Sequence, residues 1–286
     1  MPTLPGSPEM WRDAIGQQHA AATGVVRIAS LVPSVTELLF ALGLARQMVA
    51  RTGFCIHPEP AVRAVPKVGG TKDVNVARLR ALAPTHVVVN IDENRRETVD
   101  EIRGFVPNVI VTHPCAPEDN LGLYRLLGGI FGCHAEAEAL CAALQAQLDA
   151  IRVRPWPARR VLYAIWQDPW MTVSRDTYIS RMLALANWHT WPAGVEADKA
   201  CQGGDCSRRN APGERYPSFR WSDALVRELD LVLLSTEPYR FTEDHADALE
   251  RQLGKPVLLV DGEMLSWYGS RAVDGVRYLA ALAAAN

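Results

Sequence analysis

The 286-residue chain carries one order of elements twice, and this duplication restricts its fold more than any other feature. In each half, three short apolar runs alternate with stretches of helical pattern. The corresponding runs are residues 27–32 and 160–165, 85–90 and 230–235, and 108–112 and 256–260. Continuous apolar strands that alternate with helices are typical of parallel sheets covered on both faces. The sequence therefore predicts an α/β protein of two Rossmann-like lobes with parallel sheets.

Between the two halves lies a helical pattern, in which apolar residues recur every three or four positions from Leu123 to Ile151. It predicts one long backbone helix over residues 119–152, roughly 50 Å in length, that ends before Pro155 and Pro157. We expect a lead-in at residues 1–24, a first lobe at 25–118 and a connecting helix at 119–155. A second lobe would follow at 156–286, with a Gly/Cys-rich insertion at about 197–216.

Composition narrows the classes of function. A chain that is 48% hydrophobic can bury two cores without disulfides, and its net charge of −2 gives no electrostatic case for nucleic acid. The sequence shows no run long enough for membrane insertion and no secretion signal. We expect a cytoplasmic monomer with reduced cysteines, or a periplasmic protein if a native leader has been removed.

Six segments together resemble a known family. They are residues 27–37, 51–58, 68–71, 170–179, 235–239 and 261–271. In combination they are similar to the helical-backbone metal receptors, which include periplasmic proteins that bind cobalamin and ferric siderophores for ABC transporters. The resemblance covers residues 25–286 and implies the class III solute-binding-protein fold, with a ligand in the cleft between the lobes. The insertion departs from the family pattern; it is either a lid that carries Cys201 and Cys206 or a solvent-exposed loop.

Eight residues of the first lobe are candidates for ligand binding: Pro33, Ser34, Phe54, Gly69, Gly70, Thr71, Asn90 and Glu93. Ser34 and Glu37 have capping-box spacing, which would place a helix N-terminus and an anion site at the end of the first strand. The alternative is that they only cap the helix. Gly69 and Gly70 do not fit a nucleotide P-loop. The resemblance implies that these glycines approach a ligand, and the alternative is an ordinary turn.

Nine candidates in the second lobe follow its strands: Trp166, Trp170, Arg175, Tyr178, Tyr239, Arg240, Trp267, Tyr268 and Arg271. Aromatic faces at strand ends suit a large flat ligand such as a corrin, a porphyrin or an aromatic chelate, and arginines add cation–π contacts and donors. The alternative is that several of these rings seal the core of the lobe.

Two mirror-image pairs, Cys55 with His57 and His113 with Cys115, offer two thiolates and two imidazoles. Such a set matches zinc or another soft metal. The alternative is that the cysteines serve as small hydrophobic residues.

Three functions compete. The first is binding of a metal-containing small molecule without turnover, the ligand being a corrinoid such as cobalamin, a ferric siderophore or a heme-like chelate. The second is a cytoplasmic enzyme that processes such a ligand with the Cys/His set, although no catalytic motif identifies its residues. The third is the receptor of an ABC importer, which would dock through Glu37 or Glu93 and through Glu237, by analogy only.

Overall fold

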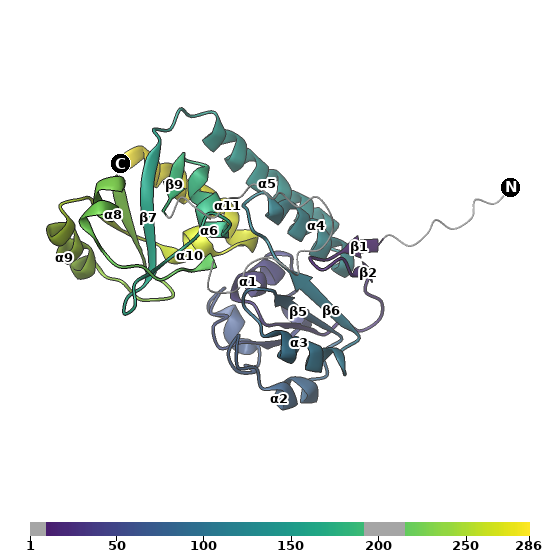
Figure 1. Ribbon diagram of the computed structural model, residues 1–286. Coiled ribbons are helices and arrows are strands. Elements are labelled where there is room, and N and C mark those ends of the chain that lie inside the picture. The colour runs from purple at the N-terminus through teal and green to yellow at the C-terminus, as the bar shows by residue number, and fades with distance from the viewer. Residues whose placement is uncertain (1–9, 192–214) are drawn as a thin grey trace. The chain divides into compact units, whose positions relative to one another are not determined.

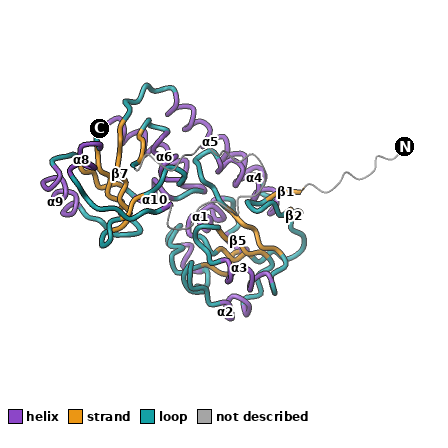
Figure 2. The backbone as a smooth tube through the Cα atoms, in the orientation of Figure 1, coloured by secondary structure: helices purple, strands orange, loops and turns teal. Residues whose placement is uncertain are grey.

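The computed structural model describes residues 10–191 and 215–286, so the predicted lid with Cys201 and Cys206 lies outside the described residues. The chain divides into two compact units (Figures 1 and 2). Unit 1 comprises Met1–Pro114 and Asn120–Ala142, and unit 2 comprises Cys115–Asp119 and Ala143–Asn286. Each unit holds a largely parallel sheet with helices, as the sequence predicts.

Unit 1 contains a four-stranded parallel sheet in the order β4-β3-β5-β6. Its strands are β3 (Ile28–Ser30), β4 (Met48–Arg51), β5 (His86–Asn90) and β6 (Asn108–Thr112), and its helices include α1 (Pro33–Ala41), α2 (Val76–Ala81) and α3 (Arg96–Arg103). Val87 and Val89 face the core with residues of α2 and α3, while Val88 between them is buried on the other face. This alternation shows that both faces of the sheet are covered.

Unit 2 is built around the strand order β11-β10-β7, with β8 and β9 alongside β7. The strands are β7 (Arg159–Trp166), β8 (Met171–Thr172), β9 (Trp188–Thr190), β10 (Leu231–Ser235) and β11 (Val257–Val260). The helices are α6 (Tyr178–Ala184), α8 (Asp223–Glu228), α9 (Glu243–Leu253), α10 (Gly262–Ser266) and α11 (Ala272–Ala285). Strand β8 runs antiparallel to β7, and the other pairs are parallel.

The predicted duplication is confirmed at the level of topology. Strands β3, β5 and β6 are neighbours in that order in unit 1, and β7, β10 and β11 repeat the order in unit 2. The register is parallel throughout both sets. The carboxyl ends of corresponding strands therefore form equivalent edges, where α/β sheets bind their ligands.

The predicted single helix over residues 119–152 is two helices, α4 (Asp119–Phe131) and α5 (His134–Arg152). Gly132 has a φ of 71° and the Cys133 amide donates to the Gly128 carbonyl at 2.8 Å, which is the C-terminal pattern of a helix that ends at a left-handed glycine. Helix α5 runs from unit 1 into unit 2. No helix within the described ranges is both long and apolar enough to cross a membrane.

The predicted lead-in, residues 1–24, contains two strands from residue 10 onward. Strands β1 (Met10–Arg12) and β2 (Gln18–Ala20) form an antiparallel hairpin. In its turn, Asp13 accepts a hydrogen bond from the Val111 amide at 3.1 Å, and the Ala14 amide donates to the Val111 carbonyl at 2.9 Å. The hairpin therefore belongs to unit 1 and attaches to strand β6.

Candidate ligand-binding site

Helix α1 begins at the carboxyl end of β3, but the predicted capping box between Ser34 and Glu37 does not form. Pro33 occupies the first helical position and Val32 is the N-cap, with no hydrogen bond from a side chain to the cap. Because the helix begins two residues earlier than a cap at Ser34 would require, Ser34 lies inside its first turn. Its hydroxyl is buried and makes no hydrogen bond to any described residue. The helix start is thus an uncapped N-terminus, which favours anions.

Phe54 is the aromatic candidate in unit 1, and it is exposed. It follows β4 in a turn closed by a hydrogen bond from the Cys55 amide to the Thr52 carbonyl at 3.3 Å, and 63% of its surface is exposed. Its ring lies over Gly70, where an added Cβ would come within 3.3 Å of the ring. Gly69 has a φ of 100° in the adjoining turn. The turn and the packing of Phe54 account for both glycines.

Asn90 is buried and serves the structure internally. Its side-chain oxygen accepts a hydrogen bond from the Asp92 backbone amide at 2.8 Å, and its backbone amide donates to the side-chain oxygen of Asn94 at 2.9 Å. Asn94 also donates to the carbonyls of Leu31 and Thr71, at 3.2 and 3.0 Å. Sequence reasoning missed Asn94, which ties three loops of this edge together; its only signal was a second asparagine four positions after Asn90.

The predicted metal quartet is not assembled. Among the described residues, no three His, Cys, Asp or Glu side chains are grouped so as to hold a metal ion. Cys55 is buried between the hydroxyls of Thr36 and Thr52, at 3.0 and 3.1 Å, and burial raises the pKa of its thiol. His113 contacts Asp92 instead, at 3.3 Å, and Cys115 belongs to the other unit. Cys55 therefore acts as a core residue, because a metal ligand needs an accessible thiolate.

The predicted aromatic residues of unit 2 fall into two separate groups. In the first, Trp170 stacks on Phe241 with ring centres 5.8 Å apart, and Tyr239 packs against Phe241 at 4.6 Å and against Trp166 at 5.5 Å. Trp170 and Tyr239 pack against the hydrophobic core, whereas Trp166 is 40% exposed at the end of β7. Among the predicted residues of this group, only Trp166 is exposed.

The second group is Tyr178, Trp267 and Tyr268, and all three are buried. The Trp267 indole donates to Glu237 at 2.8 Å, and the Arg271 guanidinium covers the Trp267 ring at 5.0 Å while it pairs with Glu263 at 3.2 Å. Burial raises the pKa of Glu237, which also accepts from the Ser266 hydroxyl. These contacts use the ring and the guanidinium within unit 2. Arg175 and Arg240, in contrast, are exposed.

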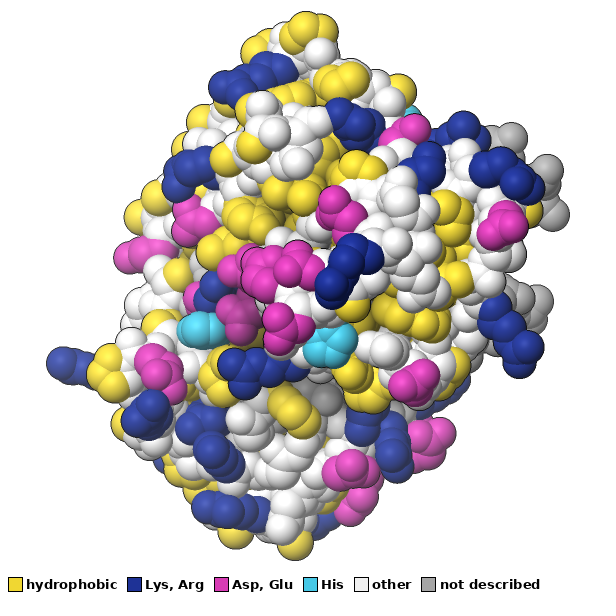
Figure 3. Space-filling model, turned by 90° about the vertical axis from the view of Figure 1, so that its left-hand side faces the viewer, with side chains coloured by type: hydrophobic (Ala, Val, Ile, Leu, Met, Phe, Trp, Pro, Cys, Tyr) yellow, Lys and Arg dark blue, Asp and Glu magenta, His cyan; other side chains and the backbone are white. Residues whose placement is uncertain are grey.

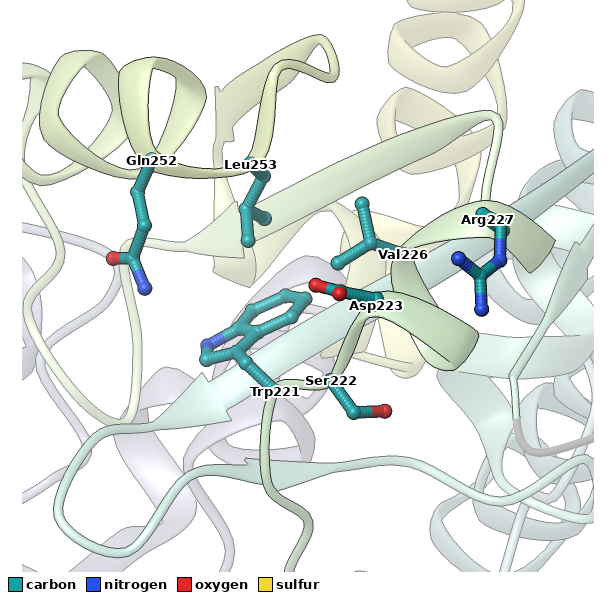
Figure 4. Close-up of a pocket in the computed structure, with 7 residues that line it drawn as sticks. All are labelled: Trp221, Ser222, Asp223, Val226, Arg227, Gln252 and Leu253. Atoms are coloured by element: carbon teal, nitrogen blue, oxygen red, sulfur yellow. The ribbon is translucent and has the colours of Figure 1, made fainter.

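A groove of about 420 Å³ on unit 2 lies apart from the predicted residues. Helix α8 and the end of α9 form its opposite sides, and Trp221 lies between them (Figure 4). A smaller groove of about 240 Å³ lies between α5 and α11. None of the predicted ligand residues lines either groove. On the face shown in Figure 3, acidic side chains gather near the middle and basic side chains are scattered, so this face offers no continuous basic field for nucleic acid.

Comparison with known proteins connects this architecture with binding proteins. The sequence profile described as "Periplasmic binding protein" matches residues 28–204. The vitamin B12-binding protein of Pectobacterium carotovorum subsp. carotovorum is 22% identical over 252 residues, which cover 86% of this chain and 83% of that protein. The match to the vitamin B12-binding protein of Photorhabdus laumondii, 25% identical over 100 residues, spans only 36% of that relative.

Solved structures share the fold over nearly the whole chain. The periplasmic vitamin B12 binding protein BtuF of Vibrio cholerae superposes with a TM-score of 0.70 at 17% identity, covering 91% of this chain and 96% of that one. The periplasmic heme-binding protein RhuT from Roseiflexus sp. RS-1 gives a TM-score of 0.70 at 21% identity, covering 92% and 98%. The profile match extends over more than half of the sequence, and the chain belongs to the periplasmic binding protein family.

Proposed function

We propose that the chain binds a metal-containing small molecule with a large flat ring, a corrinoid or a heme-like chelate, without turning it over. The observation that carries the proposal is the placement of two exposed aromatic side chains, Phe54 after β4 and Trp166 at the end of β7. Both lie at carboxyl edges of parallel sheets, where this class of fold binds ligands. Flat apolar faces gain most from a ligand that is itself flat and large.

The relatives support the class of ligand. Proteins named for vitamin B12 binding and for heme binding share the family or the fold. The uncapped start of α1 adds backbone donors that suit an anionic group of the ligand, such as a carboxylate or a phosphate.

The test is a titration of the full chain with aquocobalamin and with hemin, followed by absorption and by quenching of tryptophan fluorescence. We expect saturable binding of one of the two. Phe54→Ala and Trp166→Ala should each weaken it by about 10- to 100-fold, since truncating a buried aromatic contact costs roughly 1.5–3 kcal/mol. Ile15→Ala is the matched control, because Ile15 is 52% exposed but lies in the N-terminal hairpin. Unchanged affinity in both aromatic variants would refute the proposal.

A second candidate, favoured by family membership, is the receptor of an ABC importer. Glu237 is a poor docking residue, because its carboxylate accepts hydrogen bonds from Ser266 and Trp267 within unit 2. Docking would then depend on Glu37 or Glu93 of unit 1. The test is stimulation of the ATPase of a purified ABC importer by the wild type and by the Glu37→Ala and Glu93→Ala variants. The idea fails if the wild type gives no stimulation.

A further inference from the structure

The turn that carries Phe54 is fixed by hydrogen bonds from Arg51, a residue that was not among the predicted site residues. The Nη1 group of Arg51 donates to the carbonyls of Thr52 and Cys55, at 3.2 and 2.9 Å. These two carbonyls flank Gly53 and Phe54, so one guanidinium nitrogen closes the turn on both sides of the exposed ring.

The same guanidinium also fixes the far end of the loop. Its Nε group donates to the carbonyls of Val62 and Val65, at 2.9 and 3.1 Å. Arg51 is only 4% exposed, and among the described residues no carboxylate lies within ion-pair distance of it. A buried arginine is normally paired with an acidic residue. Here four carbonyl dipoles of one loop compensate the charge instead, which fixes the loop to the end of β4.

Cys55 supplies a second anchor for this turn. Its thiol lies 3.0 Å from the Thr36 hydroxyl of α1 and 3.1 Å from the Thr52 hydroxyl. The Gly53 amide donates to the Gly69 carbonyl at 2.7 Å, which joins the turn to the glycine segment under the Phe54 ring. The backbone on each side of Phe54 is therefore fixed, although the ring itself is exposed.

We propose that Arg51 is a positioning residue of the ligand site: it fixes the Thr52–Cys55 turn so that the Phe54 ring is held ready to stack on the ligand. The proposal rests on the function proposed above. A rigid aromatic ring loses little conformational freedom on binding, so holding it in place increases affinity without any new contact. Arginine suits this role better than lysine, because its planar fork directs several donors at fixed angles.

The first experiment is a double-mutant cycle on ligand affinity in the full chain, with aquocobalamin and hemin as probes. The variants are Arg51→Lys, Phe54→Ala and the pair together. We expect Arg51→Lys to weaken binding several-fold in the chain that keeps Phe54. In the Phe54→Ala variant, Arg51→Lys should have no further effect on affinity. Arg63→Lys is the matched control, because Arg63 lies in the same loop but is exposed and pairs with Glu59, at 2.8 Å. Additive effects of the two substitutions would overturn the proposal.

The second experiment needs no ligand. Fluorophenylalanine labels the six phenylalanines, and Phe54→Leu assigns the ¹⁹F signal of Phe54. We expect Arg51→Lys to shift or broaden that signal and Arg63→Lys to leave it unchanged; an unchanged signal in Arg51→Lys would show that Arg51 does not orient the ring. If Arg51→Lys does not fold, Arg51→Gln, which retains an amide donor, takes its place. If neither probe binds the wild type, the proposed function fails while the ¹⁹F comparison still decides whether Arg51 positions Phe54.

Discussion

Replacing Asp13 with alanine should detach the N-terminal hairpin from the sheet of unit 1. The Asp13 carboxylate is buried, and it accepts four hydrogen bonds, from the amides of Ile15, Gln17 and Val111 and from the His19 ring, at 2.9 to 3.1 Å. The Val111 bond joins residues 98 positions apart, so it ties the hairpin to a distant strand.

The size of the effect follows from what the substitution leaves behind. Asp13→Ala leaves the Val111 amide and the His19 ring buried without their acceptor. Each buried donor that is left without its acceptor costs about 1–3 kcal/mol, so we expect the free energy of unfolding of unit 1 to fall by about that much or more. Asp13→Asn should lose less, because its oxygen can still accept from Ile15 and Gln17, although its NH₂ group would face the Val111 amide.

The assay is urea unfolding followed by circular dichroism, together with native-state hydrogen exchange of the Val111 amide. Asp100→Asn is the control, since Asp100 is an exposed residue of α3 that pairs with Arg103, and such pairs contribute at most about 1 kcal/mol. A loss below about 1 kcal/mol in Asp13→Ala would refute the reasoning, because unsatisfied buried donors cost at least that much.

Three further predictions concern other parts of the chain. Gly129→Ala should lower the melting temperature, because the added Cβ would lie 2.0 Å from the Trp11 ring and overpacking costs about 1–3 kcal/mol. Gly122→Ala in the same helix is the control, because its added Cβ meets nothing within 4 Å and the substitution should be neutral or stabilising. Equal melting temperatures for the two variants would contradict this. Burial raises the pKa of Glu237, so its contribution to stability should be present at acidic pH and be lost as the pH rises from the ordinary carboxyl range through the raised pKa. Urea unfolding midpoints measured across that pH range should therefore fall in the wild type. They should fall less in Glu237→Gln. Iodoacetamide should label Cys115, which is half-buried, before Cys55, whose thiol is buried with a raised pKa, and peptide mapping by mass spectrometry that finds Cys55 labelled first would contradict the order.

The sheets were predictable from sequence because their strands are buried on both faces. Residues 87–89 and 231–234 are short continuous apolar runs, and such runs are typical of a covered parallel strand. The break at Gly132 was not predictable, since apolar residues keep helical spacing on both sides of it and an isolated glycine is tolerated within a helix. The hairpin at residues 10–20 was missed because its strands are three residues long and too polar to show a period.

Side-chain direction limited the prediction of the site. Trp166 and Trp267 both lie near strand ends and look alike in sequence, yet the first is 40% exposed and the second is buried against Glu237 and Arg271. Position in the sequence places a ring at the sheet edge, but the packing of neighbouring loops decides whether it turns inward. Arg51 was overlooked for a related reason: the four carbonyls that it binds come together only when the loop folds.

The attachment of the hairpin to Val111 also bears on how the chain avoids self-association. Strand β6 is the last strand of its sheet, and an open last strand can template pairing with another copy of the chain. Asp13 and Ala14 occupy the amide and the carbonyl of Val111, the groups through which such pairing would start. A proteolytic cut after the hairpin would therefore produce a chain that is prone to aggregation as well as less stable.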